Sequence, residues 1–76
     1  MEAQNELIKK HLVDGNSITS LEALKLFGCL RLSGRIYDLK KEGLPITAKT
    51  KTTDSGKRVA EYYIEKEALI RLTGNY

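Results

Sequence analysis

The spacing of apolar residues changes near Gly43, and this change constrains the fold more than any other feature of the sequence. Up to Gly43 the apolar residues recur every three or four positions, whereas "KRVAEYYI" at residues 57–64 alternates between two faces. A chain of 76 residues has room for one core, so we expect a single domain over residues 1–76. Helices followed by a hairpin on one core predict an α+β fold.

Two helices are expected before Gly28. The first covers residues 3–13, and its predicted apolar face consists of Leu7, Ile8, His11 and Leu12. The second is short, covers residues 20–26 and starts with the capping-box pattern "TSLE", in which Thr19 and Glu22 satisfy each other's backbone amides. Gly28 interrupts the helical pattern.

A third helix is predicted between Gly28 and Gly43. Its buried stripe is Cys29, Leu32, Ile36 and Leu39, and burying that stripe turns Arg31, Gly34, Arg35 and Asp38 outward together. Arg31 and Arg35 then lie one helical turn apart, where like charges repel by roughly 0.2–0.5 kcal/mol. An anionic partner would relieve this repulsion.

The second half of the chain predicts a β-hairpin and a closing helix. "LPITAKTKT" is expected to form a strand with Lys49 and Lys51 on one face, "TDSG" a turn, and "KRVAEYYI" the returning strand. Ile18 would add a minimal third strand. The tail "EKEALIRLTG" predicts a short helix that ends at Gly74.

Positive charge is concentrated in the middle of the chain. The formal charge is +3, but residues 25–58 contain nine basic and three acidic residues, a net of +6. A basic segment between acidic flanks is typical of a surface that binds a polyanion.

Several functional classes are disfavoured by the residues present. One cysteine and one histidine exclude an internal disulfide and leave too few ligands for a typical zinc site. Neither Cys29 nor His11 has a catalytic partner at a recognisable spacing, so we predict no enzymatic activity, small-molecule substrate, metal or cofactor. No apolar run reaches the length of a membrane span and the N-terminus lacks signal-peptide features, so a cytoplasmic location is expected.

Helix, short helix, turn, helix and basic hairpin is the order of a winged helix-turn-helix domain. "SITSLEALKLFGCLRLSGRIYDLKKEGLPI", followed by "GKRVAEYYI", also resembles the small winged helix-turn-helix proteins common in bacteriophage and prophage genomes. The resemblance covers nearly the whole chain and implies a DNA-binding fold with a three-helix core, a basic hairpin wing and a short C-terminal helix. Gly34 departs from the pattern, because a small helix former such as alanine is expected there.

The candidate DNA-binding residues follow from this arrangement. Arg31 and Arg35 of the third helix are expected to read guanines in the major groove, with Gly34 between them allowing close backbone approach. The DNA backbone would be held by the second helix and by the hairpin, through Thr19, Ser20, Lys25, Lys49, Lys51, Lys57 and Arg58. The hairpin could also enter the adjacent minor groove.

Each assignment has an alternative at this stage. Arg35 and Asp38 could form a surface ion pair, Gly34 could be a tolerated helix glycine, and the hairpin charges could deter strand aggregation. We predict a sequence-specific double-stranded DNA-binding protein, a transcriptional regulator of a phage or mobile element.

The same DNA-binding surface would serve a recombination-directionality factor that bends DNA. A different alternative is a protein-binding module that occupies a host enzyme through an apolar patch of Leu30, Tyr37 and Leu44. Because one helix reads few base pairs, two copies are expected on adjacent half-sites, in contact through the first helix or the C-terminal segment ending at Tyr76.

Overall fold

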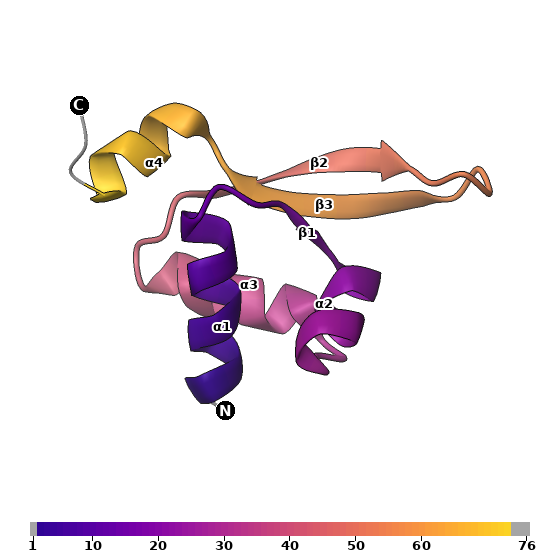
Figure 1. The fold of residues 1–76 in the computed structure, drawn as a ribbon, viewed down its shortest axis with the longest axis horizontal. Coiled ribbons are helices and arrows are strands. Elements are labelled where there is room, and N and C mark those ends of the chain that lie inside the picture. The colour runs from indigo at the N-terminus through magenta and orange to yellow at the C-terminus, as the bar shows by residue number, and fades with distance from the viewer. Residues whose placement is uncertain (1, 74–76) are drawn as a thin grey trace.

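Residues 2–73 are described by the computed structural model, which confirms the winged helix-turn-helix arrangement of four helices and a three-stranded antiparallel sheet (Figure 1). The helices are α1 (Glu2–Val13), α2 (Ser20–Phe27), α3 (Leu32–Lys41) and α4 (Lys66–Thr73). The strands are β1 (Ile18–Thr19), β2 (Ile46–Thr52) and β3 (Arg58–Ile64), and β3 lies between the other two. The predicted closing helix is therefore present as α4, whereas its predicted end at Gly74 lies outside the described residues.

The capping box predicted at the start of α2 is confirmed. The Thr19 hydroxyl oxygen accepts the Glu22 amide at 3.3 Å, and the Glu22 carboxylate accepts the Thr19 amide at 2.9 Å. Gly28 ends the helix at φ 66°, a left-handed conformation that glycine adopts without strain.

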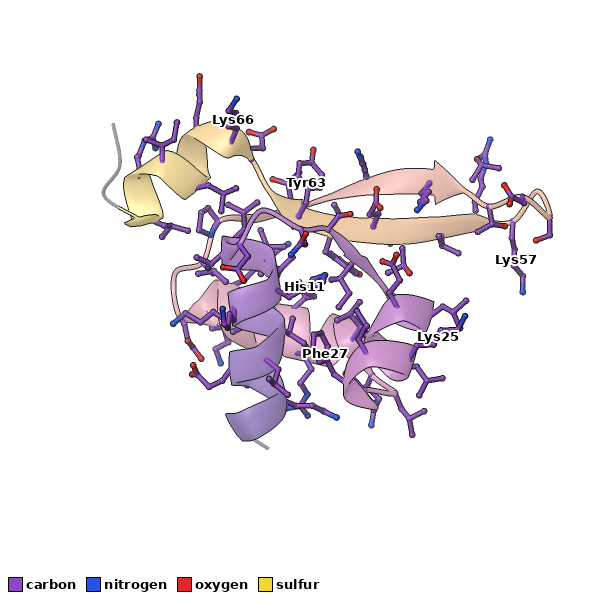
Figure 2. The ribbon with its side chains drawn as sticks, in the orientation of Figure 1. His11, Lys25, Phe27, Lys57, Tyr63 and Lys66 are labelled. Atoms are coloured by element: carbon purple, nitrogen blue, oxygen red, sulfur yellow. The ribbon has the colours of Figure 1, made fainter. Side chains whose placement is uncertain are left out.

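Contacts between α1 and α2 keep the two helices together. The imidazole of His11 donates a hydrogen bond to the Ser17 carbonyl oxygen at 3.0 Å and packs edge-on against the ring of Phe27, 5.7 Å away between centroids (Figure 2). The Gln4 side-chain amide donates to the Phe27 carbonyl oxygen at 3.3 Å. His11 therefore has a structural role at this helix contact.

The start of α3 differs from the prediction. Cys29 was expected on the first turn of this helix, but its amide donates to the Ala23 carbonyl oxygen and so completes the end of α2. Arg31 is the N-cap residue of α3, with φ −127° and ψ 67°, and its side chain makes no capping hydrogen bond. Arg31 and Arg35 are consequently not two residues within one helix.

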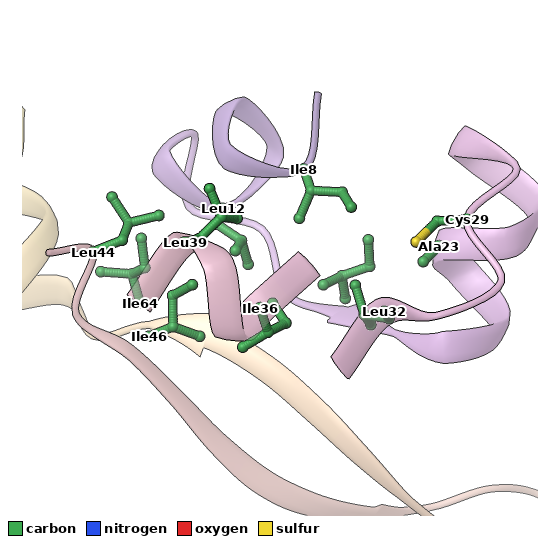
Figure 3. Packing of buried hydrophobic residues seen from close by; sticks show 11 residues of the cluster. Ile8, Leu12, Ala23, Cys29, Leu32, Ile36, Leu39, Leu44, Ile46 and Ile64 are labelled. Carbon is green, nitrogen blue, oxygen red and sulfur yellow. The ribbon is translucent and has the colours of Figure 1, made fainter. Parts of the chain in front are cut away.

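The core forms where α1 and α3 meet the sheet (Figure 3). Fully or almost fully buried side chains come from α1, β1, α2 and α3, from both hairpin strands and from the loops that flank α3: Ile8, Leu12, Ile18, Ala23, Cys29, Leu32, Ile36, Leu39, Leu44, Ile46 and Ile64. Two expectations were wrong: that Leu7 belongs to the buried face of the first helix, and that Leu44 belongs to an exposed apolar patch. Leu7 is 49% exposed because the face that α1 buries is centred on Ile8 and Leu12, and Leu44 is 8% exposed and belongs to the core.

The hairpin extends beyond the helical part of the molecule and passes over the side on which α2 lies (Figure 1). Its register pairs Lys49 with Glu61 and Lys51 with Val59, which places these four side chains on one face. Ile46 and Ile64 are paired on the other face and are buried against the core. The buried base of the hairpin thus fixes the direction of its exposed tip.

Candidate functional site

A groove of about 860 Å³ lies between α2 and the hairpin. One wall is formed by α2 and the turn that follows it, and the other by the end of β2, the hairpin turn and the start of β3. Five of the ten predicted site residues line it: Thr19, Ser20, Lys25, Lys51 and Lys57. In Figure 2, Lys57 points from the hairpin toward the side of the molecule that carries Lys25 and α2. The groove therefore brings lysines from distant parts of the chain together.

The α2 wall supplies a helix N-terminus and a cation. Thr19 is only 7% exposed and its hydroxyl is used in the helix cap, so this side chain positions α2. Ser20, the first residue of the helix, and Lys25 are both exposed. The partial positive charge of the helix N-terminus is offset by the Glu22 carboxylate, which caps it and lines the same groove, so Lys25 supplies the positive charge of this wall.

Two of the hairpin lysines are held by an acidic residue. The ammonium groups of Lys49 and Lys51 lie 3.7 and 3.6 Å from the carboxylate oxygens of Glu61. The Ser17 hydroxyl donates to the same carboxylate at 2.9 Å, and Glu61 is only 8% exposed. Lys49 also lies 5.1 Å from the centre of the Tyr63 ring. The two lysines and Glu61 together carry a net charge of +1, and the ion pairs with Glu61 fix the direction of both lysine side chains.

The environment of Glu61 favours its charged form. The hydrogen bond from Ser17, together with the charges of Lys51 and Lys49, outweighs the effect of burial and lowers the pKa of the Glu61 carboxyl from its usual value of 4.5. As a carboxylate, Glu61 of β3 therefore joins β2 and Ser17, the residue directly before β1.

The two arginines have different surroundings. Arg31 is exposed at the N-cap of α3. The Arg35 side chain is 28% exposed, donates to the Asn5 side-chain oxygen of α1 at 3.3 Å, and lies 3.8 Å from an Asp38 carboxylate oxygen. The alternative interpretation of an Arg35–Asp38 ion pair thus describes the geometry, and Arg35 additionally joins α3 to α1.

The exposed surface of α3 includes residues that were not selected from the sequence as DNA-binding candidates, among them Tyr37 of the predicted apolar patch. Besides the predicted Gly34, it consists of Ser33, Tyr37, Lys40 and Lys41. Tyr37 is 62% exposed, and the Lys41 ammonium lies 5.4 Å from the centre of its ring. The sequence contained the necessary information, because Gly34 and Lys41 fall opposite the buried Leu32–Ile36–Leu39 stripe on a helix.

The remaining predicted residues lie elsewhere on the hairpin. Lys49 and Arg58 are exposed but do not line the groove. Within residues 2–73, no cluster of histidine, cysteine, aspartate and glutamate side chains is arranged to hold a metal ion, and no helix is long and apolar enough to span a membrane.

Comparison with known families places this geometry in context. A family model described as a winged helix-turn-helix domain matches residues 3–67, from α1 to the beginning of α4. No curated protein and no solved structure matches the chain significantly.

Proposed function

Because the chain belongs to the winged helix-turn-helix domain family, we propose that it binds double-stranded DNA sequence-specifically. The observation that carries this proposal is the groove lined by Lys25 of α2 and by Lys51 and Lys57 of the hairpin. With α3 in the major groove and the hairpin at the adjacent minor groove, the neighbouring sugar-phosphate backbone is received by the groove between α2 and the hairpin. The two walls supply the cations that this backbone requires.

Contacts to the DNA backbone and to bases are divided between the elements. Phosphates are contacted from the groove by Ser20, Lys25, Lys51 and Lys57, and from the hairpin surface outside the groove by Lys49 and Arg58. Thr19 acts through the cap that aims α2. Arg31 at the start of α3 reads a guanine with two hydrogen bonds. Arg35 does the same after its hydrogen bond to the Asn5 side chain is replaced by hydrogen bonds to a guanine.

The biological role we propose is transcriptional regulation in a phage or mobile element. The resemblance to small winged helix-turn-helix proteins of phage genomes supports this role. A recombination-directionality factor would use the same surface but would bend its DNA. Comparing the gel mobility of circularly permuted duplexes distinguishes the two, since only a bent complex migrates according to the position of the site.

The experiment that tests DNA binding is a selection from random duplexes, followed by footprinting and a salt titration. We expect one site to be enriched, and its affinity to fall steeply as salt increases, because each phosphate contact releases counterions. The matched control is a scrambled duplex of the same composition, which should bind more weakly with a similar salt dependence. Absence of enrichment would reject sequence-specific binding, and absence of salt-dependent binding to every duplex would reject DNA binding altogether.

A second candidate function is supported by the apolar side chains of α2. Leu21, Leu24 and Leu26 are 60%, 43% and 58% exposed. Exposed leucines on one short helix are more typical of a protein-binding surface than of a phosphate contact. If α2 binds a host protein instead of DNA, the Leu21→Ser and Leu24→Ser variants should each lose that complex. In this case the wild type and both variants should bind DNA equally weakly.

A further inference from the structure

Leu30 is the most exposed large apolar side chain in residues 2–73, at 81%, and lies in the turn between α2 and α3. It lines the groove together with Leu24 and Lys57. Single exposed leucines are common on protein surfaces, so exposure alone indicates nothing. The position of Leu30, directly before the N-cap of the helix that enters the major groove in the proposed complex, is what requires an explanation.

The backbone at Leu30 is held firmly from both sides. Cys29, which precedes it, is 2% exposed and donates its amide to the Ala23 carbonyl oxygen at 3.1 Å. Leu32 is also 2% exposed and begins α3. Leu30 and Arg31 are therefore the exposed pair between two buried anchors, and both can be presented to a ligand with little loss of backbone freedom.

The major groove of DNA offers one apolar group to such a side chain. Every base edge presents hydrogen-bond donors or acceptors in this groove, and thymine presents a C5 methyl group in addition to its O4 acceptor. We propose that Leu30 recognises a thymine methyl group next to the base read by Arg31, an inference that rests on the proposed DNA binding. The turn would then read two neighbouring bases, one by apolar contact and one by hydrogen bonds.

The test compares thymine with uracil, which lacks only the methyl group. Wild-type protein and the Leu30→Ala variant are each titrated with the duplex recovered from the random selection, and with copies in which each thymine in turn is replaced by deoxyuridine. At one position we expect uracil to weaken wild-type binding about fourfold, the equivalent of one buried methyl group. Leu30→Ala should bind the thymine and uracil duplexes equally.

A matched control is Leu26→Ala. Leu26 is 58% exposed on α2 and does not line the groove, so this variant should retain the full preference for thymine. Circular dichroism of all variants should match the wild type, because neither leucine belongs to the core.

The outcomes separate the inference from the function on which it rests. If Leu30→Ala keeps the thymine preference, or if every uracil copy binds the wild type as well as the original duplex, Leu30 does not read a methyl group although the protein binds DNA. A selected site that contains no thymine would likewise show that Leu30 does not read a methyl group. If no duplex is bound by the wild type, the proposed function fails and this inference fails with it.

Discussion

At the scale of single residues, Gly34 is the position where folding and function place opposite demands. It lies on the exposed surface of α3, and a Cβ atom added there would meet nothing within 4 Å. Gly34→Ala should therefore raise the free energy of unfolding by about 1 kcal/mol, measured by urea denaturation. In the proposed complex the added methyl group would separate α3 from the DNA, so affinity for the selected duplex should fall.

Ser33→Ala is the control for this prediction, since Ser33 is also exposed on the first turn of α3. It should change neither stability nor affinity as strongly as Gly34→Ala. An alanine at position 34 that stabilises the protein and leaves affinity unchanged would identify Gly34 as a tolerated helix glycine.

The two arginines should be distinguishable by measuring stability beside affinity. Arg31→Ala should cost roughly 1–3 kcal/mol on the selected duplex and little on a scrambled one, with unchanged stability, because Arg31 is exposed at the N-cap. Arg35→Ala should also lower the free energy of unfolding by about 1 kcal/mol, since its hydrogen bond to Asn5 joins α3 to α1. Unchanged site preference in both variants would show that neither arginine reads bases.

At the scale of elements, the hairpin acts as a charged arm with a buried base. Replacing Lys49, Lys51 and Lys57 with glutamine should weaken binding to all duplexes by similar factors. Each lost phosphate contact should flatten the plot of log affinity against log salt by about 0.9. Lys66→Gln on α4 is the control, because this lysine is exposed and lies outside the groove. A triple variant with the wild-type slope would mean that the hairpin does not touch the DNA backbone.

The link between the hairpin and Ser17, which directly precedes β1, should depend on pH. Because the folded protein lowers the pKa of Glu61 below 4.5, its carboxylate stabilises the fold above that pH, and this contribution is lost as the pH falls through the folded pKa. Glu61→Gln should therefore be less stable than the wild type at neutral pH, and the difference should shrink below pH 4.5, measured by urea denaturation across pH.

Ser17→Ala provides the matched variant, since the Ser17 hydroxyl donates directly to the Glu61 carboxylate. Its loss should raise the folded pKa of Glu61 toward 4.5 and so reduce stability above that pH. Equal acid sensitivity in wild type and Glu61→Gln would show that this carboxylate does not couple the strands.

At the scale of the whole molecule, one α3 helix of ten residues can read only a few base pairs. We therefore expect two copies on neighbouring half-sites about ten base pairs apart, visible as a double footprint. The exposed Leu7 makes α1 a suitable contact between copies. The second predicted contact, the segment ending at Tyr76, extends outside the described residues. A single short footprint with one protein per duplex would contradict this prediction.

Short-range patterns in the sequence determined the elements. Thr19 and Glu22 start α2, Gly28 ends it, and alternation in residues 57–64 produces β3, because capping and strand patterning act over a few neighbouring residues. The order of these elements was enough to predict a winged helix-turn-helix fold, and the family match confirms it. The charge distribution likewise showed which segments would be basic.

Only the tertiary structure decided how individual side chains are used. Periodicity placed Cys29 in α3 and Leu7 in the core, but the packing of α2 and α1 assigns Cys29 to the preceding turn and leaves Leu7 exposed. Arg35 is turned to Asn5, 30 residues earlier in the chain. Lys51 lines a groove with Lys25 because β3 pairs with β1, which leads directly into α2. Such contacts join residues far apart in sequence, and they depend on how helices and strands pack, which no local spacing records.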